Sequence, residues 1–281
     1  MVDTAVRIDN VSFKYRNSDS FAIRRVSFEV KSGEFILLAG FSGSGKSTLL
    51  KCFNGLIPHF HAGSFGGNIE IFGKSTLELE TTQLANQVGF VFQNPENQIS
   101  NLTVEREIAF PLENFGIPRD KIISRVNYLI ELLNLEELRH KSPHSISGGE
   151  QQLTAIAAAL ALDPPILVLD EVTAHLSPRS AKRILELLNH LNKDHNKTII
   201  ISEHRLDRCI HFADKMALMD IGKLKFFDYP RDIFQNRNFP KVMIPKIPSL
   251  YLRLNERIDF NVEGEGIPLT VEDFLKVLNT R

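Results

Sequence analysis

Apolar and polar residues follow different periods along the chain, and these periods predict its elements. Alternation in Val6-Arg7-Ile8 and Asn68-Ile69-Glu70-Ile71 is typical of strands with one solvated face. Continuous apolar runs at 35–39, 88–92 and 166–169 predict strands that are buried on both faces, as in a parallel sheet. The pattern therefore predicts an α/β fold, with antiparallel strands over 6–35 and 67–73 beside a parallel core.

Helical spacing of apolar residues dominates two other regions. Residues from about 96 to 146 are predicted to be mainly helical, with one apolar stripe made of Ile122, Ile123, Val126, Leu129, Ile130 and Leu133. A helix is also predicted from Pro178 to Asp194, with its inward face made of Ala181, Ile184, Leu185, Leu188 and Leu191. We interpret residues 1–230 as one domain, with an inserted helical subdomain at about 96–162, and residues 231–281 as a small C-terminal appendage.

A glycine-rich loop directly follows the apolar run at 35–39. It reads Gly40-Phe41-Ser42-Gly43-Ser44-Gly45-Lys46-Ser47-Thr48 and fits the P-loop pattern at every fixed position. The following residues, Thr48 to Phe53, are predicted to form a helix closed by Gly55. Glycines let backbone N–H groups turn toward phosphates, Lys46 brings a positive charge, and the Ser47 hydroxyl is a Mg²⁺ ligand. The sequence therefore predicts an ATP site with Mg²⁺ here.

Two carboxylates end the apolar strand at 166–169. We expect Asp170 to hold Mg²⁺, directly or through water, and Glu171 to polarise the water that attacks the γ-phosphate. The alternative is a solvated pair at a strand end.

A third phosphate-contacting candidate is Ser147-Gly148-Gly149-Glu150-Gln151, which precedes an alanine-rich, helix-favouring stretch. Ser147 can cap this helix, and the glycines allow backbone amides to approach a phosphate closely. A simple helix cap is the alternative, but it does not explain both glycines.

Composition narrows the setting. The chain has 281 residues, 43% of them hydrophobic, and a net charge of −1, so we expect no nucleic-acid partner. Two cysteines, Cys52 and Cys209, suit a reducing compartment and suggest no disulfide framework. No apolar run approaches the roughly 20 residues that cross a bilayer, and Met1-Val2-Asp3 does not begin a signal peptide. Any membrane role is therefore expected to depend on partners.

The order of these motifs resembles the nucleotide-binding subunit of ABC transporters, over about residues 6–228. The resemblance implies a P-loop ATPase with a RecA-like parallel core, an antiparallel subdomain and a helical subdomain. It implies that Tyr15 stacks on adenine, that Gln93 senses Mg²⁺ and the lytic water, and that His204 bonds the γ-phosphate. A core aromatic, an exposed strand-end glutamine and a structural histidine are the respective alternatives.

The same resemblance implies a dimer. In that family two chains pair head to tail, so that Ser147, Gly148 and Gly149 of one chain close over ATP on the other. Catalysis is then expected from Glu171, His204, Gln93 and Lys46, on the cytoplasmic face of a membrane.

Several further stretches resemble the energy-coupling factor (ECF) ATPases, which drive uptake of vitamins or of transition-metal ions such as cobalt and nickel. They are 53–59, 92–98, 102–110, 203–206 and 268–272. The implied partners are a second ATPase, a transmembrane coupling protein that docks near residues 93–98, and a membrane protein that captures substrate. His59, His61, His140 and His144 do not predict a metal site, because no carboxylate or cysteine cluster completes a ligand set.

Three positions depart from the ABC pattern. Val172 replaces the usual proline, Ser177 the usual aspartate, and Leu153 the usual arginine after the signature. Ser177 followed by Pro178 is still a good helix start. In the family that aspartate links the two ATP sites, so Ser177 favours a non-identical partner ATPase over an identical one.

Two other functions remain open at this point. One is a soluble ABC ATPase that acts on DNA or ribosomes, although such proteins usually carry a long coiled-coil insertion or tandem halves. The other is a hydrolysis-poor regulatory nucleotide sensor, which Ser177 and Val172 suggest.

Overall fold

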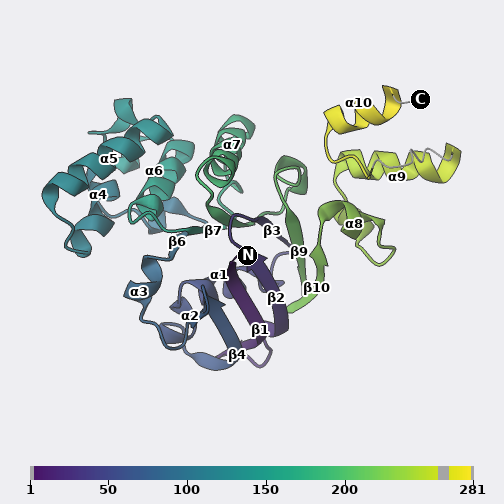
Figure 1. The fold of residues 1–281 in the computed structure, drawn as a ribbon, viewed down its shortest axis with the longest axis horizontal. Helices are drawn as coiled ribbons and strands as arrows, with labels where there is room; N and C mark the ends of the chain where they lie inside the picture. The colour runs from purple at the N-terminus through teal and green to yellow at the C-terminus, as the bar shows by residue number, and fades with distance from the viewer. Residues whose placement is uncertain (1–2, 259–265, 280–281) are drawn as a thin grey trace.

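The computed structural model describes residues 3–258 and 266–279 (Figure 1). Residues 259–265 and 280–281 of the predicted appendage, and Met1 and Val2 at the start, lie outside the described residues. Two sheets and three groups of helices make up the described part.

A six-stranded sheet forms the centre, in the order β10-β9-β3-β8-β7-β6. Its strands are β3 (Phe35–Ala39), β6 (Val88–Val91), β7 (Ile166–Asp170), β8 (Thr198–Ser202), β9 (Lys215–Asp220) and β10 (Lys223–Asp228). Neighbours from β6 to β9 are parallel, and β10 pairs antiparallel with β9. Every residue of β3, β7 and β8 is buried, as the continuous apolar runs predict.

The two faces of this sheet belong to different cores. Phe35, Leu37 and Ala39 pack on one face with α7 (Pro178–Lys193) and the helical region, whereas Ile36 and Leu38 pack on the other with α1 (Lys46–Phe53). Alternate residues of a strand point to opposite faces, so one short apolar run serves both cores. The five residues predicted to face inward on α7 are all buried, which confirms that stripe.

A smaller antiparallel sheet covers α1 from the far side, in the order β2-β1-β4-β5. It contains β1 (Thr4–Tyr15), β2 (Ile23–Lys31), β4 (Gly63–Ile71) and β5 (Lys74–Ser75), joined to the core by the short helices α2 (Leu56–His59) and α3 (Thr81–Ala85). Register pairs such as Ile8 with Phe28 and Ile8 with Ile69 place alternating apolar residues on the inner face. The predicted antiparallel subdomain is therefore present.

Three helices gather at one end of the molecule: α4 (Val104–Asn114), α5 (Arg119–Leu133) and α6 (Gly148–Leu160) (Figure 1). The predicted stripe of α5 is correct at Val126, Leu129, Ile130 and Leu133, which are buried. It is wrong at Ile123, which is 48% exposed. Consecutive helical residues lie about 100° apart, so Ile122 packs against the core and its neighbour cannot.

The C-terminal helices lie at the opposite end, beside β10 (Figure 1). They are α8 (Pro230–Gln235), α9 (Lys246–Ile258) and α10 (Val271–Asn279), and their buried residues, such as Phe234, Tyr251 and Phe274, continue the core under α7. The backbone N–H of Lys246 donates to Asp207 Oδ1 at 2.7 Å, which ties α9 to the loop after β8. None of the helices in the described ranges has the length and apolar character needed to cross a membrane.

Candidate functional site

The P-loop turns sharply between β3 and α1. Gly40 and Gly45 have φ of 149° and 102°, in the region that favours glycine. A Cβ on Gly40 would lie 2.4 Å from the Met219 carbonyl oxygen, and one on Gly45 would lie 2.4 Å from that of Ala22. Neither position can accept a side chain without moving backbone. The loop therefore leads directly into the N-terminus of α1, where unpaired N–H groups favour an anion.

Lys46 is the first residue of α1 and its side chain is almost fully buried. Its Nζ donates to the carbonyl oxygens of Gly40 at 2.9 Å and Phe41 at 3.2 Å, and lies 3.5 Å from Glu171 Oε1. Burial lowers the pKa of Lys46, and the charge of Glu171 opposes that shift. A buried cation held on weak carbonyl partners is placed to turn toward a phosphate, which offers a stronger one.

Glu171 lies at the centre of the predicted catalytic group. Its Oε1 lies 2.7 Å from His204 Nε2, and its Oε2 accepts a hydrogen bond from Gln93 Nε2 at 3.0 Å. The residue has φ of 49°, and its backbone N–H donates to Ser202 Oγ at 2.9 Å. The Glu171 carboxylate is thus contacted by Lys46, Gln93 and His204, which come from three other segments of the chain. Both carboxylate oxygens of Glu171 are held by partners, which fixes the orientation of the group.

Asp170 ends β7 and is buried. The Ser202 hydroxyl donates to Asp170 Oδ1 at 2.7 Å and also accepts the Glu171 N–H, so one serine at the end of β8 orients both carboxylates. Sequence reasoning missed Ser202, although it stands at the end of a predicted strand. Polar residues at the carboxyl end of a parallel strand are the signal that could have identified it.

Glu203 is a second residue that sequence reasoning missed. Its Oε1 accepts the N–H groups of His204 at 2.9 Å and Arg205 at 3.0 Å, and its Oε2 accepts the Thr173 hydroxyl. This buried carboxylate fixes the backbone that carries His204. It also joins that backbone to Thr173, which follows Glu171. The positions of His204 and Glu171 are therefore fixed relative to each other.

The donors around Asp170 fit a magnesium ion. Mg²⁺ prefers oxygen ligands, and Ser47, Asp170 and Gln93 supply a hydroxyl, a carboxylate and an amide oxygen. The Gln93 amide nitrogen is occupied by Glu171, so the amide oxygen is the group left for a cation. These residues could therefore hold the Mg²⁺ ion that accompanies a nucleoside triphosphate.

Tyr15 ends β1 on the other side of the P-loop helix. Its hydroxyl lies 3.2 Å from Thr48 Oγ1, and its ring makes edge contacts with Phe13 at 4.8 Å and His61 at 6.2 Å between centroids. The ring is partly buried and packs against the core cluster, so one side of it stays accessible. It is placed to cover a base whose phosphates lie on the P-loop.

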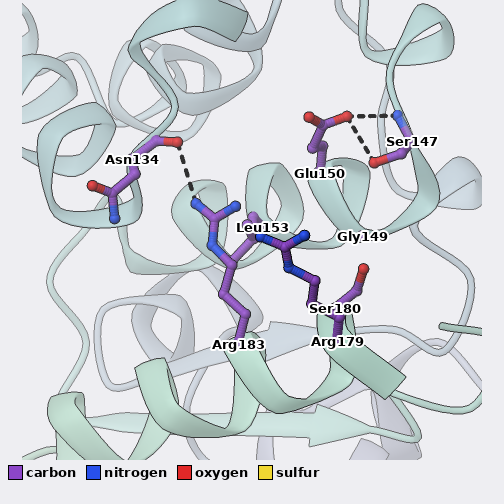
Figure 2. A pocket seen from close by; sticks show the side chains of 8 residues that line it. All are labelled: Asn134, Ser147, Gly149, Glu150, Leu153, Arg179, Ser180 and Arg183. Carbon is purple, nitrogen blue, oxygen red and sulfur yellow. Dashed lines mark hydrogen bonds between the residues drawn. The ribbon is translucent and has the colours of Figure 1, made fainter. Parts of the chain in front are cut away.

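Ser147 caps α6, as predicted. The Ser147 N–H and Oγ both donate to Glu150 Oε2, at 2.8 and 2.7 Å, and these two bonds lower the pKa of Glu150 (Figure 2). Gly149 lies tightly on α7, because a Cβ there would meet Ser180 Cβ and Oγ at 2.8 Å, whereas one on Gly148 would meet only Leu176 at 3.8 Å. A simple helix cap requires neither glycine. Gly149 allows α6 to pack closely on α7, and Gly148 leaves open space beside the backbone.

We call Ser147–Glu150 the signature loop and α6, which it begins, the signature helix. A pocket of about 480 Å³ lies beside this helix, and Figure 2 shows the side chains around it. Leu153, where the family has arginine, is buried on its floor. Arg179 and Arg183 reach the pocket from α7, and Arg183 Nη2 donates to the carbonyl oxygens of Leu133 at 2.9 Å and Asn134 at 3.3 Å. Positive charge therefore comes to this pocket from α7 and not from α6.

The other two departures are accommodated as well. Ser177 Oγ accepts the Ser180 N–H at 3.1 Å and Pro178 occupies the first helical position, so the predicted start of α7 is confirmed. Val172 is buried in the core under α6 and α7.

The signature helix and the P-loop do not serve each other within the chain. Across residues 3–258 and 266–279, no hydrogen bond or ion pair joins Ser147–Glu150 to Gly40–Thr48. The two predicted phosphate-contacting loops are therefore separate surfaces.

Comparison with known proteins gives a consistent result. Residues 23–174 match the family model described as ABC transporter. A protein of Pyrococcus horikoshii named as an ABC transporter ATP-binding protein is 41% identical over 277 residues, covering 97% of this chain and 96% of its own. One from Methanosarcina mazei is 40% identical and covers 98% of this chain, which spans 46% of that protein.

Solved structures agree. The structure of CbiO1 from Clostridium perfringens, described as part of the ABC transporter complex CbiONQ, has a TM-score of 0.75 and 28% identity, covering 92% of this chain and 96% of its own. The ATP-binding cassette MJ0796, in a dimeric post-hydrolysis state with ADP and Pi, has a TM-score of 0.70 and 29% identity, covering 80% of this chain and 98% of its own.

Proposed function

Because the chain belongs to the ABC transporter family of ATP-binding proteins, whose activity is ATP hydrolysis coupled to transport, we propose that it powers an importer of the ECF type. The observation that carries the proposal is the likeness to CbiO1, which covers 92% of the chain where the MJ0796 cassette covers 80%. The larger share supports a likeness that reaches into the C-terminal helices, beyond the general cassette. The cargo is a micronutrient, either a vitamin or a transition-metal ion.

The chemistry proposed for the site follows from its contacts. Tyr15 covers the adenine, and the N–H groups of the P-loop bind the phosphates of ATP. Lys46 leaves the Gly40 and Phe41 carbonyl oxygens for the outer phosphates. Mg²⁺, held by Ser47, Asp170 and Gln93, would offset phosphate charge when bound.

Glu171 orients the attacking water in this proposal. His204 and Gln93 hold its two oxygens, so the carboxylate is fixed before the water arrives. His204 then bonds the γ-phosphate, and its backbone is fixed by Glu203 for that purpose. Positioning and electrostatics, not covalent chemistry, carry phosphoryl transfer of this kind.

The active unit in this proposal is a head-to-tail pair of ATPases on the cytoplasmic face of the membrane. The signature loop Ser147–Glu150 closes the ATP site of the second chain, because it meets no P-loop in its own. Ser177 keeps the helix cap but lacks the charge of the usual aspartate, which favours a paralogous partner. The division at about residue 230 into ATPase domain and appendage remains a prediction.

A groove of about 350 Å³ is the proposed docking site for the transmembrane coupling protein. Gln98 fixes its edge, since its Oε1 accepts the Phe92 N–H at 3.2 Å and its Nε2 donates to the Phe90 carbonyl oxygen at 3.3 Å. Phe110, 42% exposed, and Glu107, almost fully buried, line the same groove. Glu107 Oε2 is already bonded by the Ser100 and Asn101 N–H groups and by the Asn101 amide, so the apolar wall is what suits the apolar face of an amphipathic helix.

Co-purification of the tagged chain from its own membranes tests this function. We expect an integral membrane protein and a second ATPase to copurify, and Phe110→Ser to reduce their recovery about tenfold. Ile123→Ser is the matched control, because Ile123 is 48% exposed on α5 and does not line the groove. Recovery of ribosomes or DNA in place of a membrane protein would instead establish the soluble ABC ATPase.

ATP turnover by the recovered complex separates the motor from a regulatory nucleotide sensor. The contacts of Glu171 favour turnover, because a sensor does not need both carboxylate oxygens held. A complex that binds ATP without hydrolysing it would contradict the motor.

A further inference from the structure

A partly open cavity of about 620 Å³, which we call the appendage cavity, lies between α8, α9 and the segment that joins them. Its apolar lining includes Phe234, Phe239, Ile244 and Leu252, with the Phe234 and Phe239 rings edge to face at 5.3 Å between centroids. Four charged side chains, Arg237, Lys241, Arg253 and Glu256, line it as well. The size is within the range of small-molecule sites, roughly 300–1,000 Å³.

The charges around this cavity are unbalanced. Among the described residues that line it, three cations stand against one carboxylate, a net charge of +2. Arg237, Lys241 and Arg253 form no ion pair with any acidic residue in the part of the chain that the structure describes. Two basic residues near the C-terminal helices do have acidic partners: Lys215 pairs with Glu34 at 2.8 Å and Arg231 with Asp273 at 3.1 Å. Among the described residues, the three cations of the appendage cavity therefore remain available to an anionic ligand.

We propose that the appendage cavity binds a small organic anion with an apolar body and about two negative charges. The aromatic and aliphatic lining accepts the body, and the cations accept carboxylate or phosphate groups. A ligand of this class would match both the net charge of +2 and the mixed lining, which neither a bare inorganic anion nor a neutral hydrophobic compound does.

The cavity is connected to the ATP site by one segment of chain. Ile244 lines the appendage cavity and also a second cavity of about 370 Å³, which Phe41 of the P-loop and His204 line from the other side. Lys246, two residues on, is bonded through its N–H to Asp207, three residues after His204. A ligand that contacts Lys241 and Ile244 would therefore touch the segment that also lines the cavity beside His204. We expect such a ligand to change nucleotide affinity.

Calorimetry with 1-naphthyl phosphate, an aromatic dianion, tests the site on the purified chain. Saturating ADP occupies the P-loop, so that the probe cannot bind there. We expect 1-naphthyl phosphate to bind with one site per chain, and inorganic phosphate and 1-naphthol each to bind at least about tenfold more weakly, since each supplies only half of the ligand.

Lys241→Gln and Arg253→Gln should each weaken binding of the probe about tenfold, because each removes one charged contact. Lys182→Gln is the matched control: Lys182 is an exposed cation on α7, away from the cavity, and its loss should leave the affinity unchanged. No binding to the unmodified chain, or equal binding by all variants, overturns the proposal.

Two further measurements complete the test. Vesicles of anionic lipid that bind through Lys241 and Arg253, while the probe does not bind, would overturn the small-molecule site in favour of a membrane surface.

The probe should also shift the dissociation constant of ADP by about fivefold or more, and ADP should shift that of the probe equally, as linkage requires. A shift of zero overturns the connection to the ATP site. Neither experiment needs a transport partner, so failure of the importer proposal leaves the result intact.

Discussion

The P-loop site and the signature helix both carry glycines at the start of a helix, yet their surroundings differ. Around the P-loop, Lys46, Gln93 and His204 all contact Glu171. Around the signature loop, the described pocket lining has one carboxylate, Glu150, which is held by Ser147. The P-loop is surrounded by side chains that can do chemistry, whereas the signature loop presents backbone amides beside the cations Arg179 and Arg183.

This difference fits the proposed head-to-tail pair of ATPases. A site that holds its own base and cation needs from outside only a lid that completes phosphate binding. A capped helix with free amides is such a lid, and it needs no reactive side chain of its own. Variants of the P-loop site should therefore affect chemistry or nucleotide affinity, and variants of the signature should affect pairing.

The largest effect is expected for Glu171→Gln. The amide keeps the size of the side chain but cannot accept a proton from water, so ATP hydrolysis should fall at least about 100-fold. ATP binding should persist, and size-exclusion chromatography should show an ATP-dependent paired state of the chain with itself or with its copurified partner. The matched control is Glu186→Gln on α7, whose only ion pair is with exposed Lys182. Turnover within threefold of the unmodified chain would remove Glu171 from its role.

Gly149→Ala tests the other half of the comparison. The added Cβ would lie 2.8 Å from Ser180, so the N-terminus of α6 must shift, at a cost of about 1–3 kcal/mol. In the Glu171→Gln background we expect the ATP-dependent paired state to weaken about tenfold, while ATP affinity of the single chain is unchanged.

A second substitution can reverse this effect. Ser180→Gly removes the atoms that the new methyl group would meet, so the double variant should recover part of the pairing. Loss of ATP binding in Gly149→Ala alone would contradict the separation of the two loops, because the signature would then support its own chain's site.

The parts of the site that could be predicted from sequence are those encoded locally. The P-loop glycines, the apolar strands and the Ser147 and Ser177 caps each depend on a few consecutive residues, and the structure has them where the pattern places them. The helical stripe was right except at Ile123, where two adjacent apolar residues could not both face inward.

The parts that escaped prediction depend on contacts between distant segments. Ser202 reaches Asp170 across neighbouring strands, and Glu203 reaches Thr173 in the same way, so no local pattern marks either one. The appendage cavity escaped for a different reason: its lining lies within one continuous stretch, residues 234–256, and only the packing of α8 and α9 brings these side chains together. Parallel strands bring together residues that lie far apart in the sequence, and the spacing of apolar residues along the chain does not predict such contacts.

Tyr15→Ala should produce a smaller effect, confined to the chain's own nucleotide. Removing the ring loses about 1 kcal/mol of stacking on the base, so ATP affinity should fall about fivefold. Tyr15→Phe keeps the ring and loses only the contact with Thr48, and should bind ATP within about twofold of the unmodified chain. Equal affinity for ATP and for inorganic triphosphate in the unmodified chain would show that no residue stacks on the base.

The smallest effect is expected at Ser177, which acts on the signature loop only through Ser180. Ser177 fixes Ser180, and Ser180 packs against Gly149, so the start of α7 positions the signature. Ser177→Asp preserves the cap and restores the charge that the family places opposite the second site. We therefore expect two- to threefold faster ATP hydrolysis by the chain assembled with itself and little change with its natural partner. Ser177→Ala loses the cap and should lower the free energy of unfolding by about 1 kcal/mol, measured by urea denaturation. An Asp variant that hydrolyses ATP no faster in the self-paired state would show that the missing charge is not what favours a non-identical partner.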